Sequence, residues 1–503
     1  MQLSKIKIKN YRLIVDAELD VDKKTTLIVG RNNTAKTSCM DCIGNVLNGR
    51  DFSYDDYPLE KREELHRLLT QFMAKEITYT ELCEKLALIS IEFEVDYSLD
   101  DPDANLGALS PFIIDVDVDT TTALIRAECK LKIDEKSLWN LFESSFYRNG
   151  TYSPDNEEVH NRLVDNFRKL FGLILYAVNP KNVEDRQIKA TKELSDLFPF
   201  YSIPAERTLG EDGVQNNNSL SALITSFFDM SEDDLDPRVS EEVKTLRKIV
   251  EDANKDVQKR SDAILSSVVN SSIGFGYPNG EELQLGVTTQ LRIDDQIKNQ
   301  TKLSYTFGLS GESLPSTHNG LGYKNLIKME FLLAAFARDV EKHGTACIPL
   351  LFIEEPESHM HPQMQHAFAD YLEKFLGKIS SVHIQTFLTS HSAHIANTMD
   401  FSKIRYAQKT KSGVIYKNLH SFAEKNPANM DFIKKYLTLS RCDLFFADKI
   451  IFVEGASERL LLPDVITKCD KAGLFASRKY NLPAQYYALI EIGGHMPINS
   501  FLL

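Results

Sequence analysis

Three glutamates follow a short apolar run in the second half of the chain. The run is Cys347–Ile353, and the acids are Glu354, Glu355 and Glu357. An apolar run this short predicts a buried parallel strand, and ligands of open α/β sheets bind beyond the carboxyl ends of such strands. Two adjacent glutamates there suit nucleotide hydrolysis, because Glu354 can hold the water shell of a Mg²⁺ ion and Glu355 can orient an attacking water. The ordinary alternative is a buried strand that ends in an acidic turn.

A phosphate-binding loop would have to accompany these acids, and the segment between Val29 and Cys39 is a candidate. An apolar strand is predicted before it, at Thr25–Val29, and a helix after it, at Cys39–Leu47. In such loops backbone N–H groups and the helix N-terminus hold phosphates, the lysine neutralises charge and the threonine hydroxyl binds Mg²⁺. The alternative is a polar turn that happens to contain Lys-Thr. The candidate nucleotide-binding residues are Gly30, Asn32, Asn33, Thr34, Ala35, Lys36, Thr37 and Ser38.

Ala35 departs from the usual pattern, since glycine normally stands before the lysine. Alanine resists a positive φ angle and adds a methyl group near the phosphates. Two outcomes are open. If position 35 is helical, alanine is tolerable; if it must be left-handed, nucleotide binding suffers.

Two further segments could contact phosphates. A Gly-rich turn that contains Asn319, Gly320 and Gly322 precedes an apolar helix predicted at Leu326–Arg338. A turn of this kind at a helix start can bind anions, although Gly-rich turns are common. His391 follows a predicted strand at residues 382–389 and could sense a γ-phosphate, with a solvated or capping histidine as the ordinary alternative.

The elements that position these residues are predicted from apolar periodicity. Strands are expected at 2–9, 14–19, 25–29, 89–97, 111–117, 121–133, 198–205, 382–389 and 448–453, with sheet-like sequence at 281–306. Helices are expected at 58–88, 136–172, 363–377, 431–446 and 459–465. The polar segment from Gly210 to Asn270 has helical spacing at Val239–Ser267 and is interpreted as a helical excursion used for dimerisation.

Composition narrows the class of protein. The 503 residues are enough for two or more domains, and 43% hydrophobic with 26% charged residues is typical of a globular protein. No membrane span or signal peptide is expected, so a cytoplasmic location is predicted. The seven cysteines are scattered and are interpreted as reduced thiols, and zinc is not expected at the lone Cys39-x-x-Cys42 pair. A net charge of -14 argues against a nucleic-acid-coating surface but allows a local basic groove.

In this order, the phosphate loop, Gly-rich helix start, Glu-Glu strand and strand-Ser-His resemble an ABC-type ATPase head of the RecF and SMC kind. The expected fold is therefore α/β. In such heads two copies sandwich ATP between the phosphate loop of one and the signature turn of the other. The resemblance implies Lys36 and Thr37 on phosphate and Mg²⁺, Glu354 on Mg²⁺, Glu355 as catalytic base and His391 as switch histidine. It also implies that Asn319, Gly320 and Gly322 form the signature turn, without the usual Ser-Gly-Gly wording.

The segment Asp448–Glu458 has an apolar strand that ends in Glu-Gly and resembles the opening motif of a Toprim domain. An ATPase head followed by Toprim is the arrangement of the OLD (overcoming lysogenization defect) family of ATP-dependent endonucleases, which includes the Gabija anti-phage nuclease. The resemblance implies DNA cleavage at Glu454 and Glu458 with Mg²⁺ or Mn²⁺. Family members also carry a later Asp-x-Asp, and none follows Glu454 here. The nuclease site is therefore expected to be incomplete in this chain.

The resemblance implies a division into four segments. They are residues 1–207, the first part of the head; 208–275, the helical insertion; 276–425, the second part of the head; and 426–503, an incomplete Toprim domain. The expected partners are DNA, further copies of the chain in a homodimer or tetramer, and a possible accessory defence protein. The alternative function is a non-nucleolytic, ATP-switched DNA-binding or scaffold protein.

Overall fold

The computed structural model describes part of the chain in detail. The described residues are 1–86, 89–98, 106–115, 117, 119–148, 151–205, parts of 241–260, 304–306, 313–315, 321–343, 346–377, 383–410, 412–421, 445–447, 449–475 and 482–491. The chain divides into two compact units. One contains Met1–Glu206 and Phe336–Leu503, and the other contains Arg207–Ala335.

The first unit contains an antiparallel sheet with strand order β2-β1-β4-β5-β8-β9. The bounds are β1 Gln2–Tyr11, β2 Ile14–Asp20, β4 Ser90–Asp96, β5 Thr122–Leu131, β8 Phe171–Val178 and β9 Arg186–Lys189. In β4, Ile91, Phe93 and Val95 are buried while the residues between them are partly exposed. This alternation places one face of the sheet on a core and leaves the other nearer to solvent.

A second, mainly parallel sheet has the order β10-β13-β14-β3-β15-β16. Its strands are β3 Thr25–Gly30, β10 Phe200–Ile203, β13 Leu350–Glu354, β14 Gln385–Ser390, β15 Ile404–Thr410 and β16 Gly413–Asn418. Only β16 runs antiparallel to its neighbour. All residues of β3 and β14 are buried, as a sheet covered on both faces requires. The order puts β14 between the strand before the phosphate loop and the strand before the acids.

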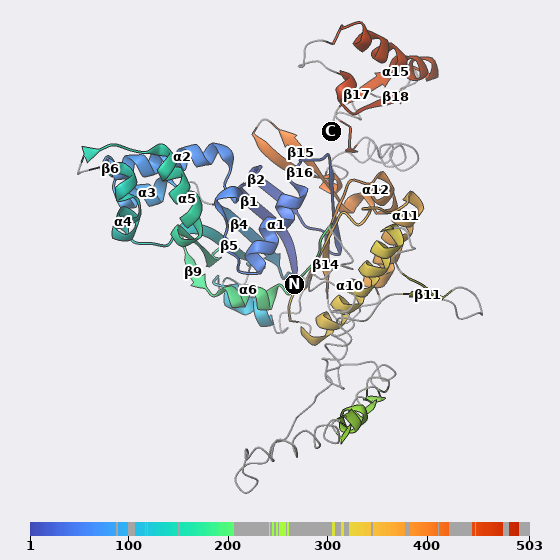
Figure 1. Cartoon of the computed structure of the whole chain (residues 1–503), viewed down its shortest axis with the longest axis horizontal. Coiled ribbons are helices and arrows are strands. Elements are labelled where there is room, and N and C mark those ends of the chain that lie inside the picture. Colours follow the sequence, from blue (N-terminus) through green and yellow to red (C-terminus); the bar gives the residue numbers. More distant parts are fainter. Residues whose placement is uncertain are drawn as a thin grey trace, which may run out of the picture. The chain divides into compact units, whose positions relative to one another are not determined.

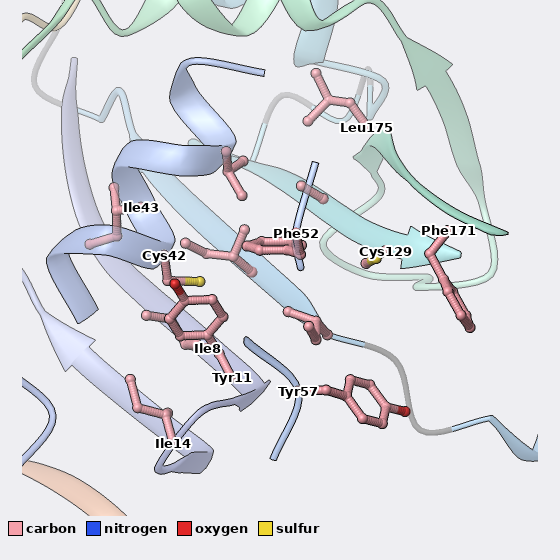
Figure 2. Packing of buried hydrophobic residues seen from close by; sticks show 14 of the residues in the cluster. Ile8, Tyr11, Ile14, Cys42, Ile43, Phe52, Tyr57, Cys129, Phe171 and Leu175 are labelled. Carbon is pink, nitrogen blue, oxygen red and sulfur yellow. The ribbon is translucent and has the colours of Figure 1, made fainter. Parts of the chain in front are cut away.

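Helix α1 (Lys36–Leu47) packs between the two sheets, with contacts to β1 and β4 of one and β3 and β10 of the other (Figure 1). Figure 2 shows Cys42 and Ile43 of this helix beside Ile8 and Tyr11 of β1 in a shared apolar core. The ring of Tyr11 stacks at a tilt on Phe52, with centroids 5.5 Å apart. The helix that begins at the phosphate loop is therefore fixed by a core built from both sheets.

One side chain joins the sheets directly. Gln385 of β14 accepts a hydrogen bond from the Leu3 N–H at 2.7 Å and donates to the Leu3 carbonyl at 2.8 Å. The side-chain amide of Gln385 therefore pairs with the backbone of Leu3 in β1 as a neighbouring strand would. Because Gln385 is buried, this pairing satisfies polar groups that would otherwise be costly.

Further helices of the first unit flank the sheets. They are α2 Leu59–Met73, α3 Tyr79–Lys85, α4 Glu135–Phe146, α5 Asn156–Leu170, α6 Thr191–Leu197, α11 Pro362–Leu376 and α12 Ala393–Thr398. Residues Tyr147–Tyr152 include the short strands β6 (Tyr147–Arg148) and β7 (Thr151–Tyr152). Toward the C-terminus the chain forms a βαβ unit with parallel strands. It consists of β17 (Lys449–Val453), α15 (Ala456–Lys471) and β18 (Tyr487–Glu491).

In the second unit, the described strands β11 (Ser304–Thr306) and β12 (Ser313–Pro315) pair antiparallel. The described residues of 241–260 are helical, as the spacing predicted. Helix α10 spans Leu321–His343 and extends from this unit into the first. It is longer than predicted, so Gly322 lies within its first turn and not in a preceding loop.

Three predictions of secondary structure were wrong. The described residues of 111–117 do not form a strand, because Gly107–Phe112 form a 3₁₀ helix that contains Pro111. The helix predicted at 58–88 is two helices separated by a turn in which Lys75 has a φ of 62°. The helix predicted at 136–172 is interrupted by β6 and β7 and ends where β8 begins. The sheet-like stretch at 281–303, and residues 431–444 of the helix predicted at 431–446, fall outside the described residues.

Candidate functional site

The phosphate-loop candidate begins with a glycine that the packing demands. A Cβ atom added to Gly30 would lie 2.6 Å from the Ala407 carbonyl oxygen and 3.1 Å from the Ala407 Cβ. Ala407 stands opposite Gly30 on the neighbouring strand β15. Inside the loop, the buried Thr34 hydroxyl donates to the Arg31 carbonyl at 2.8 Å and closes the turn.

Ala35 adopts the left-handed conformation, with φ 60° and ψ 25°. Of the two outcomes left open by the sequence, this is the one in which alanine is strained. Asn33, two residues earlier, also has a positive φ of 63°. Non-glycine residues in this region store strain and persist only where their surroundings hold them, and such positions cluster at functional sites.

Lys36 is the first residue of α1, and its side chain turns back over the loop. The ammonium donates to the carbonyls of Gly30 at 2.8 Å and Arg31 at 2.7 Å. Burial lowers the pKa of Lys36 to about 8, and the negative charges of Glu355 and Glu357 partly oppose this by raising it. A buried lysine at a helix N-terminus is suited to a polyphosphate, because both the ammonium and the N-terminal end of the helix favour negative charge.

Glu355 lies at the carboxyl edge of the parallel sheet in a strained conformation, with a φ of 40°. Its backbone N–H is held by Thr389 of the neighbouring strand, at 3.1 Å from the carbonyl oxygen and 3.3 Å from the hydroxyl. The neighbouring strand therefore fixes the turn that directs this carboxylate.

His391 connects the acid to the lysine. Its Nε2 lies 2.9 Å from Glu355 Oε1, and its Nδ1 lies 3.4 Å from Lys36 Nζ. Burial, and then the Lys36 charge, lower the pKa of His391 below 6.5, while Glu355 opposes this. At neutral pH the imidazole is then uncharged, and its neighbours select the tautomer in which Nε2–H donates to Glu355 and Nδ1 accepts from Lys36. The three side chains predicted from separate segments form one hydrogen-bonded chain.

Glu357 joins this site, although the sequence reading gave it no role. Its Oε1 accepts from the His391 backbone N–H at 2.5 Å and from the Ser390 hydroxyl at 3.0 Å. Its Oε2 is buried and has no hydrogen-bond partner among the described residues. Burial raises the pKa of Glu357, and these hydrogen bonds oppose the rise. The sequence signal that could have identified Glu357 is its position as the third acid of the Glu-Glu-Pro-Glu run.

For the remaining residues predicted to bind the nucleotide or Mg²⁺, the structure gives the position in the fold and the exposure of the side chain. Thr37 is exposed in the first turn of α1, and Glu354 is partly buried as the last residue of β13. A hydroxyl and a carboxylate are the hard oxygen ligands that Mg²⁺ prefers, so this donor set fits that ion. Asn32 is exposed in the loop and Ser38 is partly buried in α1. Asn319 and Gly320 lie outside the described residues, and Gly322 belongs to the second unit.

The Toprim-like segment presents its acids at one strand edge. Glu454 is exposed directly after β17. Glu458 accepts a hydrogen bond from the Gly455 N–H at 3.0 Å and thereby caps α15. Glu491, at the end of β18 beside Val453, pairs with Arg459 at 3.2 Å. Among the described residues, no cluster of three or more His, Cys, Asp or Glu side chains could hold a metal ion.

The residues just before this segment contact the nucleotide-site candidate. The Phe446 ring lies 6.5 Å from the His391 ring, measured between centroids. Phe445 stacks at a tilt near Phe401 and Tyr406. Sequence reasoning missed this contact, because two phenylalanines carry no signal of their partner.

The sequence predicted neither a zinc site at Cys39 and Cys42 nor a membrane span. Cys39 and Cys42 are buried free thiols on α1, and burial raises the pKa of Cys39 to about 12. None of the described helices combines the length and the apolar character needed to cross a membrane.

Known proteins resemble this chain over both segments. A sequence model of the AAA ATPase domain matches residues 1–396, and one of the TOPRIM domain of Overcoming lysogenization defect protein-like proteins matches residues 445–502. Endonuclease GajA of Bacillus cereus strain HuB5-5 is 25% identical over 560 residues, which cover 98% of this chain and 75% of that protein. OLD nuclease of Thermus scotoductus is 24% identical over 278 residues, or 54% of this chain and 46% of that protein.

Among solved structures, the SMC head domain of Thermotoga maritima matches with a TM-score of 0.32 and 10% identity, covering 83% of this chain and 99% of that one. The sequence-model match is the stronger finding, since it spans far more than half of the chain and includes Lys36, Glu355 and His391. The chain therefore belongs to the AAA ATPase domain family, and its C-terminal segment to the OLD-like TOPRIM domains.

Proposed function

We propose that this protein binds and hydrolyses ATP at the Gly30–Ser38 loop and uses the nucleotide to control a metal-dependent DNA endonuclease site in its Toprim segment. The observation that carries the first half is the chain of contacts from Lys36 through His391 to Glu355. Membership of an ATPase family and the matched TOPRIM segment support the combination.

Each residue has a role that follows from its chemistry. Backbone N–H groups of the loop and the Lys36 ammonium bind the phosphates. The Thr37 hydroxyl and the Glu354 carboxylate would hold Mg²⁺, which neutralises charge on the phosphates when it is bound. Glu355 orients the attacking water and accepts its proton, and the neutral imidazole of His391 fixes the direction of that carboxylate.

A second copy would complete the nucleotide site. The proposed signature turn at Asn319, Gly320 and Gly322 would face the phosphate loop of another copy, in a homodimer or tetramer that the helical insertion at 208–275 helps to hold.

In the Toprim segment, Glu454 and Glu458 would bind Mg²⁺ or Mn²⁺ for phosphodiester cleavage. As the resemblance to the OLD family implies, the role would be defence against phage in the cytoplasm, with an accessory defence protein as a further partner.

ATP turnover tests the first half of the proposal. Lys36→Ala is expected to lower kcat/KM about 100- to 1,000-fold, the usual cost of removing one group that stabilises developing charge. Glu355→Gln is expected to lower kcat about 100-fold or more with little change in KM, since it removes the base and keeps the shape. Lys374→Ala, which removes an exposed lysine on α11, is the control. Wild-type turnover in Lys36→Ala would refute this site.

Plasmid nicking with Mg²⁺ or Mn²⁺ tests the second half. The Toprim acids Glu454 and Glu458 are not followed by the Asp-x-Asp of family members, so we expect any nicking by this chain to depend on ATP and to be lost in Glu454→Ala. Asp464→Ala, which removes an exposed acid paired with Lys468 on the same helix, is the control. Nicking that survives in Glu454→Ala would place the nuclease site elsewhere.

A second candidate function is an ATP-switched DNA-binding or scaffold protein without nuclease activity. The observation that favours it is the Glu458 carboxylate, which caps α15 and so already has a structural role. The two functions are separated by ATP-dependent retention of DNA: retention without nicking in either metal would favour the scaffold.

A further inference from the structure

Ala35, the strained residue before Lys36, is held by a side chain from β16, the edge strand that lies two strands from β3 in the sheet. The Ala35 carbonyl accepts the helical Cys39 N–H at 2.9 Å and the Tyr416 hydroxyl at 3.0 Å. Both acceptor positions of this carbonyl oxygen are therefore used. The Ala35 carbonyl shares its peptide plane with the Lys36 N–H, so whatever fixes the carbonyl also fixes the direction of that N–H.

The sheet itself places Tyr416 at the loop. Tyr416 of β16 stands opposite Ala407 of β15, and Ala407 stands opposite Gly30 of β3. The row Gly30–Ala407–Tyr416 thus crosses three strands at the point where the loop begins. Close approach of Gly30 to Ala407 sets the spacing of this row, and the tyrosine side chain is long enough to reach past Ala407 to the loop.

The surroundings of the Tyr416 hydroxyl favour the Ala35 carbonyl as its acceptor. It also lies within hydrogen-bonding reach of the Cys39 thiol, which is buried and a weak hydrogen-bonding group. Burial raises the pKa of Tyr416, so the hydroxyl stays protonated and acts as a donor at neutral pH. Ala35 is thereby the main acceptor of this donor.

We propose that Tyr416 is a positioning residue of the nucleotide site, which holds Ala35 in the left-handed conformation that glycine would adopt without strain. The inference rests on the proposed binding of ATP phosphates by this loop. In most conformations open to alanine the Ala35 carbonyl points elsewhere, and the Lys36 N–H turns with it. The Tyr416 hydroxyl selects the conformation that fixes the direction of the Lys36 N–H.

A double-mutant cycle tests this coupling. The variants are Tyr416→Phe, Ala35→Gly and the combination of both, and the measurements are kcat and KM for ATP and the Kd of adenylyl imidodiphosphate. In the natural background, Tyr416→Phe is expected to raise KM and Kd about two- to tenfold, the effect of one net hydrogen bond, with a smaller change in kcat. In the Ala35→Gly background the same change is expected to cost less than about twofold, because glycine needs no clamp.

Two controls give each outcome a meaning. Tyr97→Phe removes a tyrosine hydroxyl that donates to the Thr120 carbonyl at 2.7 Å, and it should leave KM unchanged. Lys36→Ala shows whether ATP binds at this loop at all. Unchanged ATP binding in Lys36→Ala would overturn the proposed function and this inference with it. Loss of binding in Lys36→Ala, with equal effects of Tyr416→Phe in both backgrounds or with none, would overturn the inference alone.

Discussion

Glu357 offers a sharp test of how the site is held together, because one of its oxygens carries two hydrogen bonds. Oε1 accepts from the backbone N–H of His391 and from the hydroxyl of Ser390. Glu357→Ala removes this acceptor and leaves both donors in a largely buried place. Glu357→Gln keeps an accepting oxygen at the same position, removes the charge and puts an NH2 group in place of the unpartnered Oε2.

The magnitude follows from these two bonds. Hydrogen bonds to a charged group contribute about 1.5–3 kcal/mol each, so their loss amounts to about 3–6 kcal/mol. Relief from burying a carboxylate whose Oε2 has no partner offsets part of this. We expect Glu357→Ala to lower the free energy of unfolding by about 2–4 kcal/mol, and Glu357→Gln to change it by less than about 1 kcal/mol.

Catalysis should separate the same two variants. If Glu357 fixes the His391 backbone, Glu357→Ala lets the imidazole shift away from Glu355, and a misplacement of about 1 Å can cost about 100-fold in rate. We therefore expect Glu357→Ala to lower kcat about 10- to 100-fold, mostly without a change in KM, and Glu357→Gln to stay within about threefold of wild type.

The assays are steady-state ATP turnover and urea unfolding on the same preparations. Glu94→Ala is a matched control, since Glu94 also accepts from a serine hydroxyl, that of Ser4 at 3.1 Å, but on the antiparallel sheet. Wild-type kcat in a folded Glu357→Ala protein would refute the positioning role. An equal loss of kcat in both Glu357 variants would show that the charge matters and not the acceptor.

Three further outcomes are expected. Burial raises the pKa of Glu357 above 4.5, so just above that pH the folded chain binds more protons than the unfolded chain. The free energy of unfolding of the wild type, relative to that of Glu357→Gln, should therefore be highest below pH 4.5 and fall as the pH rises through the folded pKa. Urea unfolding at a series of pH values would show this. Gly30→Ala should lower stability by about 1–3 kcal/mol and weaken ATP binding, because its Cβ would meet the Ala407 carbonyl, whereas Gly377→Ala, with ordinary contacts, should change little in the same assays. Phe446→Ala should reduce the dependence of nicking on ATP while turnover persists, since its ring lies beside His391 and precedes the Toprim segment; unchanged dependence would rule out this link.

Local pattern was enough for most elements of the head. The strict alternation in β4 follows from which face of the sheet is buried, and the sequence displays that period. The short apolar centres of β3 (Leu27–Val29) and β14 (Phe387–Leu388) indicated strands that are buried on both faces. Where the prediction failed at 111–117, an apolar run with Pro111 satisfied its backbone in a 3₁₀ helix and not in a ladder. The break near Lys75 depends on a left-handed residue that no periodicity reports.

Residue types also predicted which side chains would lie together. Lys36, Glu355 and His391 were singled out because lysine after a loop, paired acids after a strand and a polar histidine after a strand each suit a nucleotide site. The structure brings all three together, as the order of the parallel strands requires. For Asn319 and Gly320, and for the proposed Toprim ligands, the roles stay predictions.

The sequence by itself determined the strand-loop-helix order, the acidic strand edge and the kind of ligand that those groups suit, because these depend on neighbours a few residues apart. Only the tertiary structure decided that Ala35 is left-handed, that Glu357 holds the backbone of His391 and that Tyr416 reaches the loop from 381 residues away. These contacts join segments distant in sequence, and their partners are selected by strand order and packing, which leave no periodic signal along the chain.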